Sequence, residues 1–176
     1  MAQRRLRQLL LGLGVLVCAW ALGGCGFELR RPPEFAFKSL YTSVAPVSVL
    51  GMELKRDLAS VGSVQLITDP MQAKNAQVVL DIVEEIREKV VVGMNASGQV
   101  REFQLRLRLK FRLRTQDGRE LIPETELLQQ RDLSYSEVYA LSKEAEEAML
   151  YRNMQTDIVH QIMRRMAAIK TLDTAD

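Results

Sequence analysis

Residues 103–114 read FQLRLRLKFRLR, and apolar and polar side chains alternate along the whole stretch. A period of two residues is the repeat of a β-strand, so the pattern predicts one strand with an apolar face and a cationic face. At about 3.3 Å per residue this strand would span roughly 40 Å. The apolar face requires a cover of other elements, and the cationic face requires water, acidic side chains or an anionic partner.

Hydrophobic periodicity predicts further elements on both sides of this strand. A helix is indicated where apolar side chains recur at three and four residues, and Gly62 is placed to end the first of the two helices. The predicted strands are 35–42, the residues around Val64 and Leu66, 78–92, 103–114 and about 119–134, and the predicted helices are 46–61 and 141–169. The sequence therefore predicts an α+β fold, with two helices packed on one face of a largely antiparallel four- to five-stranded sheet.

Chain order and turn residues refine this prediction. The first strand, helix and second strand suggest a βαβ crossover with parallel strands. The next strands form two hairpins, with turns at residues 93–98 and 116–118. Along residues 78–92 we expect Ile86, Val90 and Val92 to continue the core-facing register of Val78. Pro123 predicts an edge position or a bulge for the last strand.

The hairpin turns also predict which charges lie opposite one another. We expect Gly93 to pair with Gly98, and a three-residue turn after Thr115. The facing pairs would then be Asp81 with Lys110, Glu85 with Arg106, Glu124 with Arg112, and Glu126 with Lys110. This register leaves Arg108 and Arg114 without a facing acid, so both are candidates for contact with an anionic ligand or partner, as is Lys143 near the start of the last helix. The alternative is a solvated face whose charges compensate one another.

The first 24 residues have the pattern of an export signal. Three arginines lie within residues 1–7, and the apolar stretch 9–22 is too short to span a membrane comfortably. Residues 22–25, LGGC, resemble the lipobox of bacterial lipoproteins, which implies a lipid on Cys25 and cleavage after Gly24. The alternative is an ordinary cleaved signal that happens to end before a cysteine. We therefore expect a signal at 1–24, an acylated tether at 25–34, one domain at 35–170 and a tail at 171–176.

Composition and motifs narrow the classes of function. Removing the signal takes away three arginines and no acid, so the net charge falls from +2 to −1 and gives no support for nucleic-acid binding. The mature chain has one cysteine, and His160, with Asp157 one helical turn before it, is expected to be a surface or packing residue. Because no zinc-binding cluster, phosphate loop or nucleophile elbow is recognisable, we expect no metal, no cofactor and no enzymatic activity.

Residues 25–30, CGFELR, resemble the CG(F/W)xLR start of the LPS-assembly lipoprotein family, the E component of the lipopolysaccharide transport machine. The order of strands and helices is also similar. The resemblance implies a lipid-anchored outer-membrane protein that faces the periplasm, and Gly26 after Cys25 fits that destination. It also implies that the protein plugs the lumen of the LPS-assembly outer-membrane β-barrel protein, helps that barrel to fold and assists lipopolysaccharide insertion.

The same resemblance gives the cationic candidates a target. Arg108, Arg114 and Lys143 would meet carboxylates of the barrel or phosphates of lipid A. The alternative function is a free-standing, periplasm-facing lipoprotein that binds a lipid or another anionic ligand. Such a protein would need a concave apolar pocket between its helices and its sheet.

Overall fold

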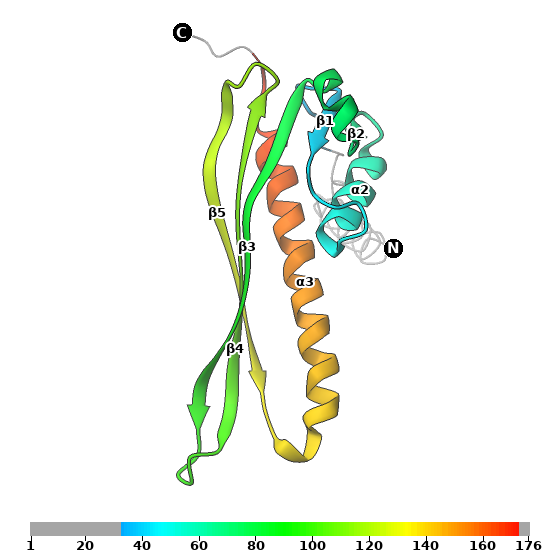
Figure 1. Cartoon of the computed structure of the whole chain (residues 1–176). Coiled ribbons are helices and arrows are strands. Elements are labelled where there is room, and N and C mark those ends of the chain that lie inside the picture. The colour runs from blue at the N-terminus through cyan, green and yellow to red at the C-terminus, as the bar shows by residue number, and fades with distance from the viewer. Residues whose placement is uncertain (1–32, 173–176) are drawn as a thin grey trace, which may run out of the picture. The chain divides into compact units, whose positions relative to one another are not determined.

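Five strands and two α-helices make up the part of the chain that the computed structural model describes, residues 33–172 (Figure 1). In chain order they are β1 (Ser39–Thr42), α2 (Val49–Val61), β2 (Gln65–Ile67), β3 (Val78–Met94), β4 (Val100–Thr115), β5 (Glu120–Ser134) and α3 (Ala140–Ala167), with short 3-10 helices η1 (Pro70–Asn75) and η2 (Glu137–Tyr139). The predicted α+β fold is confirmed. The predicted signal and Cys25 lie outside the described residues.

The sheet is mixed, with strand order β2-β1-β3-β4-β5. β1 runs parallel to both of its neighbours, whereas β3, β4 and β5 are antiparallel hairpins. The expected parallel pairing of the strands around the first helix is therefore confirmed. β5 lies at one edge of the sheet, and its pairing with β4 shifts near Pro123, between Leu113 and Phe111. Pro123 thus occupies both an edge strand and an irregular part of it.

α2 is bounded by two local signals. The Ser48 hydroxyl accepts a hydrogen bond from the Gly51 amide at 3.0 Å, so the helix begins after Ser48 and not at Pro46 as predicted. Gly62 has φ 70°, and its N–H bonds to the Leu58 carbonyl, which confirms the predicted end of the helix.

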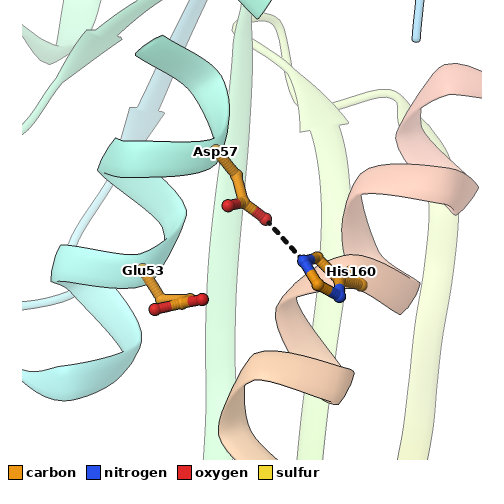
Figure 2. A group of neighbouring side chains, drawn as sticks. All are labelled: Glu53, Asp57 and His160. Atoms are coloured by element: carbon orange, nitrogen blue, oxygen red, sulfur yellow. Dashed lines mark ion pairs between the residues drawn. The ribbon is translucent and has the colours of Figure 1, made fainter. Parts of the chain in front are cut away.

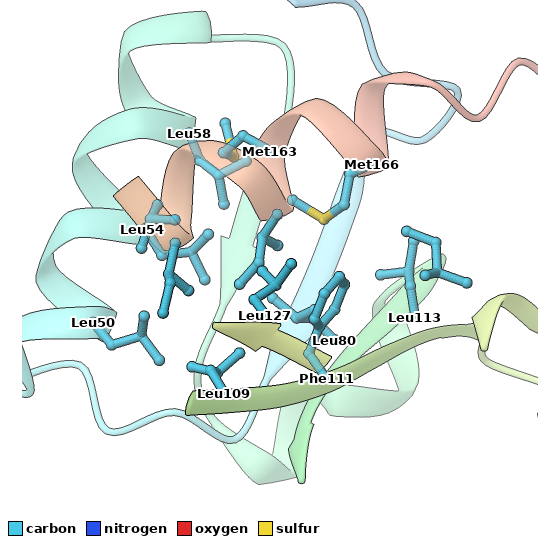
Figure 3. Close-up of a cluster of buried hydrophobic side chains, with 14 of the residues drawn as sticks. Leu50, Leu54, Leu58, Leu80, Leu109, Phe111, Leu113, Leu127, Met163 and Met166 are labelled. Carbon is cyan, nitrogen blue, oxygen red and sulfur yellow. The ribbon is translucent and has the colours of Figure 1, made fainter. Parts of the chain in front are cut away.

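The core lies between the sheet and the two helices (Figure 3). On β4, Leu105, Leu107, Leu109, Phe111 and Leu113 are all at most 1% exposed. They are covered by α3, through Met154, Ile158, Ile162 and Met166, while α2 contributes Leu50, Leu54 and Leu58. The odd-numbered face of the alternating stretch is therefore the apolar one, as predicted.

β3 contains a bulge that the sequence analysis did not anticipate. Its pairing with β4 shifts between Ile82 and Glu84, so Val83 is an extra residue. Past the bulge Glu85, Arg87 and Lys89 stand opposite the buried leucines of β4, whereas Ile86 and Val90 stand opposite Arg108 and Gln104. The prediction that Ile86 and Val90 share the core register of Val78 is wrong, because one inserted residue exchanges the two faces of a strand.

Several apolar residues at the start of α3 are exposed. Leu141 is 82% exposed, and Ala145 and Ala148 are also exposed. The side of the helix that meets β3 here carries charge, and Glu147 bonds to Lys89 with 2.6 Å between carboxylate and ammonium. The apolar stripe begins at Tyr151. Within residues 33–172, neither helix combines the length and the hydrophobicity needed to cross a membrane.

Candidate interaction surface

One side of the β3-β4-β5 meander faces away from α2 and α3, and we call this side the outer face (Figure 1). Within the described residues, no helix covers it. Its central row is the polar half of β4, with β3 and β5 on either side. The row consists of Gln104, Arg106, Arg108, Lys110, Arg112 and Arg114, all of them half-buried.

The pairing across the outer face differs from the predicted register. Lys110 does stand opposite Glu126, as expected. The turn between β3 and β4 and the bulge in β3 together shift the other acids, so that Asp81 faces Arg112, Glu84 faces Lys110 and Glu88 faces Arg106. The predicted pairing of Gly93 with Gly98 is also wrong, since Gly93 stands opposite Glu102. The predicted pairs of Asp81 with Lys110 and of Glu85 with Arg106 are therefore incorrect.

Arg114 has acidic neighbours that the predicted register did not give it. Its Nε lies 2.9 Å from Asp81 Oδ2, and Arg112 Nε lies 3.0 Å from the same oxygen. Glu120 stands opposite Arg114 on the other side. The prediction that no acid faces Arg114 is wrong, because Glu120 faces it on β5 and Asp81 bonds to it from β3.

Asp81 is held in its charged form by these two arginines. Burial alone raises the pKa of its carboxyl, but hydrogen bonds from Arg114 and Arg112 outweigh burial and hold the pKa below its ordinary value. Asp81 therefore acts as a shared counterion for one end of the cationic row.

Arg108, at the middle of the row, has a different environment. The residues that face it are Ile86 on β3 and Leu128 on β5, both apolar. Its closest acid is Glu126, with 3.4 Å between Arg108 Nε and Glu126 Oε1. Among the described residues, this buried Nε has no hydrogen-bond partner. The expectation that no acid directly faces Arg108 is confirmed. At the centre of the outer face, Arg108 therefore has only a long ion pair with Glu126 and an Nε without a hydrogen bond within the described residues.

Lys143 lies at the start of α3, beside the end of β5. Its ammonium donates to the Ser134 hydroxyl at 3.0 Å and to the Glu146 carboxylate at 2.8 Å. Both partners belong to this chain, so Lys143 is already paired within the fold. The contact roles of Arg108, Arg114 and Lys143 with a ligand or partner stay predictions.

A groove lies between α3 and the charged half of β3. This groove of about 640 Å³ includes Arg87, Lys89, Glu144, Glu147, Tyr151, Arg152 and Gln155 in its lining. The Tyr151 hydroxyl donates to the Glu88 carbonyl at 2.7 Å, and the Arg87 guanidinium lies over the Tyr151 ring. Most of the residues that line the groove are charged or polar, and its aliphatic members are Val49 and Ala148, so the groove lacks the continuous apolar wall that the alternative function requires.

His160 lies on α3 with its side chain 51% exposed, as expected of a surface histidine. Its acidic neighbour is not Asp157, whose carboxylate bonds to Arg131 at 2.6 Å. Instead His160 Nε2 lies 3.4 Å from Asp57 Oδ2 on α2, and Glu53 lies one helical turn before Asp57 (Figure 2). Burial raises the pKa of the Asp57 carboxyl, His160 opposes the rise, and Glu53 adds to it.

The sequence analysis missed this group, because over 100 residues separate His160 from the two acids. The available signal was the four-residue spacing of Glu53 and Asp57, which places two carboxylates on one side of a helix.

Comparison with known proteins gives a consistent match. The family model for LptE, described as lipopolysaccharide-assembly, matches residues 37–166. The LPS-assembly lipoprotein LptE of Yersinia enterocolitica is 29% identical over 171 residues, covering 95% of this chain and 78% of that protein. The protein of the same name from Yersinia pestis strain Pestoides F is 28% identical over 170 residues, with the same two coverages.

Solved structures show the same fold. The uncharacterized lipoprotein B of Nitrosomonas europaea has a TM-score of 0.68 and 33% sequence identity, covering 81% of this chain and 91% of that chain. The rare lipoprotein B of Shewanella oneidensis has a TM-score of 0.62 at 20% identity, covering 74% and 95%. A minor lipoprotein of Acinetobacter baumannii also reaches 0.62, at 23% identity, covering 81% and 100%. The last two support the fold alone.

Proposed function

Because the chain belongs to the LptE lipopolysaccharide-assembly family, we propose that it is a non-enzymatic lipoprotein that acts in lipopolysaccharide assembly at the outer membrane. The observation that carries this proposal is the family match, which runs from just before β1 to the last turn of α3. Cys25 holds the lipid anchor, and the folded domain faces the periplasm. Acyl chains on one residue are sufficient for stable anchoring when more than one chain is attached.

In the finer form of the proposal, the domain enters the lumen of the LPS-assembly outer-membrane β-barrel protein. There it plugs the barrel, helps it to fold and assists the insertion of lipopolysaccharide. The outer face supports this role, because its cations and acids are largely paired with one another within a half-buried row. A polar face with balanced charges is compatible with the hydrated, polar interior of a large barrel. A face with uncompensated charge of one sign, or an apolar face, would fit that interior less well.

Arg108 is the proposed centre of the contact with anionic groups, which are carboxylates of the barrel or phosphates of lipid A. Ile86 and Leu128, which face it, supply no counter-charge, and its ion pair with Glu126 is long at 3.4 Å, so an incoming carboxylate or phosphate competes with only one weak internal partner. Arg114 and Lys143 are weaker contributors, since each must share or exchange a partner that it already holds.

The alternative is a free-standing lipoprotein that binds a lipid or another anionic ligand. The groove at Arg87 and Lys89 offers cations for a headgroup, but Glu144 and Glu147 lie in the same lining and Lys89 is paired. For a hydrocarbon chain, the lining offers two aliphatic residues, Val49 and Ala148, beside these charged groups. The barrel-bound role is therefore the better supported of the two.

Affinity purification from detergent-solubilised outer membranes tests the proposal. We expect wild type to recover a large β-barrel protein in stoichiometric amount, together with lipopolysaccharide. Absence of such a protein would exclude the barrel-bound role. Arg108→Gln is expected to recover less barrel protein or less lipopolysaccharide, whereas the matched control Lys110→Gln has a smaller effect because Glu84 and Glu126 are already beside Lys110. If both variants recover partners as wild type does, recognition lies elsewhere, with residues 93–98 and 134–142 the next segments to test.

A further inference from the structure

Three potential metal ligands meet where α2 and α3 lie next to each other (Figure 2). Glu53 and Asp57 are four residues apart on α2, so both carboxylates project from the same side of that helix. His160 extends toward them from α3. One ligand atom from each of these three side chains can be chosen so that all three atoms lie within 4.8 Å of one another.

We propose that Glu53, Asp57 and His160 form a binding site for a divalent transition-metal ion, with Zn²⁺ as its best-suited occupant. Three features of the site support this assignment: its geometry, its burial and its charge.

The geometry is close to that of a coordinated ion. With metal–ligand bonds of about 2.0–2.2 Å, two ligand atoms around a tetrahedral Zn²⁺ stand about 3.3 Å apart. Asp57 Oδ2 and His160 Nε2 are 3.4 Å apart, so this pair needs no rearrangement. The Glu53 carboxylate needs to approach by up to about 1.5 Å to complete the triangle, which a side chain with several rotatable bonds can do.

The exposure of the three side chains increases from Glu53 to His160, as is expected of a metal site that is open on one side. Glu53 is 7% exposed, the Asp57 side chain is 18% exposed and His160 is half exposed. The inner ligands are thus shielded from water, while the side of His160 leaves room for a water molecule as fourth ligand. Three protein ligands and one open position are the usual arrangement of a zinc site that is not fully closed.

Charge and ligand type select the class of ion. Two carboxylates share this buried region, and the cation paired with Glu53 is Arg56, whose side chain is mostly exposed and free to turn toward water. A bound divalent ion would neutralise both carboxylates. The imidazole nitrogen favours Zn²⁺ and its first-row neighbours over Mg²⁺ and Ca²⁺, which prefer oxygen ligands alone.

The bound ion would link two parts of the fold that are distant in sequence. α2 belongs to the crossover between β1 and β2, whereas α3 is the last element of the chain. A metal at this position would therefore tie the crossover to the closing helix, in addition to the apolar contacts between them.

Calorimetric titration of the full-length protein in detergent, purified without a polyhistidine tag, tests the site. Wild type is expected to bind one Zn²⁺ per chain, with a rise in its thermal midpoint, and to bind Mg²⁺ far more weakly. His160→Ala and Asp57→Asn should each lose at least about tenfold in Zn²⁺ affinity. Asp157→Asn is the matched control, since it changes the same kind of side chain one turn from His160 but outside the site, and it should bind as wild type does.

Two further readouts separate loss of a ligand from loss of the fold. The visible absorption of bound Co²⁺ should appear in wild type and in Asp157→Asn, and should be absent in His160→Ala. The metal-free midpoint of His160→Ala should stay close to that of wild type, because the side chain is half exposed. Absence of Zn²⁺ binding by wild type at millimolar metal, unchanged affinity in His160→Ala, or equal affinity for Mg²⁺ would each overturn the proposal.

Discussion

Replacing Leu107 and its neighbour Arg108 in turn tests the assignment of the two faces of β4. Leu107 is fully buried, and β4 is held by β3 on one side and β5 on the other. Leu107→Ala removes three carbon atoms, which at about 0.8 kcal/mol each corresponds to about 2.4 kcal/mol of lost burial. A strand paired on both sides cannot move in to fill the space, so a cavity term brings the expected loss to about 2.5–5 kcal/mol.

Arg108→Ala should cost far less. The ion pair with Glu126 is long at 3.4 Å, and both side chains are partly exposed to water. Pairs of this kind contribute about 0–1 kcal/mol, and the variant also removes the buried Nε that has no partner within the described residues. We expect a net change of about 0.5 kcal/mol or less.

Urea unfolding followed by circular dichroism measures both changes, in a Cys25→Ala form that starts at residue 25 and carries no lipid. With a slope of about 2 kcal/mol per molar urea, Leu107→Ala should lower the midpoint by about 1.2–2.5 M and Arg108→Ala by about 0.25 M or less. A larger loss in Arg108→Ala than in Leu107→Ala would show that the two faces are assigned the wrong way round. A loss below about 1 kcal/mol for Leu107→Ala would show that this part of the core is not tightly packed.

Three other predictions concern the lipid anchor, the C-terminal end of α2 and the carboxylate of Asp81. Intact mass spectrometry of membrane-extracted protein should show a lipid adduct in wild type and none in Cys25→Ala, and a wild-type protein without lipid would exclude the lipoprotein anchor. Gly62→Ala should lower stability in the same urea assay by about 1 kcal/mol, because Gly62 has φ 70° at the end of α2 and a side chain is strained there; an unchanged midpoint would argue against this helix end. Asp81 has a pKa below its ordinary value of 3.8, so the stability it contributes is present above about pH 3.8 and is lost as the pH falls through the lowered value. The advantage of wild type over Asp81→Asn should therefore be present at pH 6 and shrink below pH 3.8, and an advantage that grows in acid would contradict the pairing with Arg112 and Arg114.

The alternating stretch of β4 was enough to predict the layers of the fold. Because the period of two is unbroken from Phe103 to Arg114, it specifies a long strand, its buried face and the need for helices on one side. Gly62 and Pro123 were also predictable, since each allows few backbone conformations. These signals are local, and a sequence shows local signals directly.

The pairing between strands was less predictable. A bulge at Val83 leaves no distinct mark in VVLDIVEEIREKV, where apolar residues continue on both sides of it. The turn register was mispredicted as well, since Gly93 stands opposite Glu102, and the two shifts together changed the partners of Asp81 and Glu85. The proximity of His160 to Asp57 was beyond sequence reasoning altogether, because it depends on how α2 and α3 cross in the finished fold.

The position of α3 at the end of the chain has a consequence for how the newly made protein is protected. Strands β3, β4 and β5 are local hairpins that can form early. Until the residues up to Met166 have been synthesised, however, the row from Leu105 to Leu113 has no helix to cover it. An uncovered apolar sheet of this kind aggregates readily. Stable burial of this sheet therefore has to wait for α3, and a truncation before Met154 would leave an aggregation-prone sheet instead of a smaller stable domain.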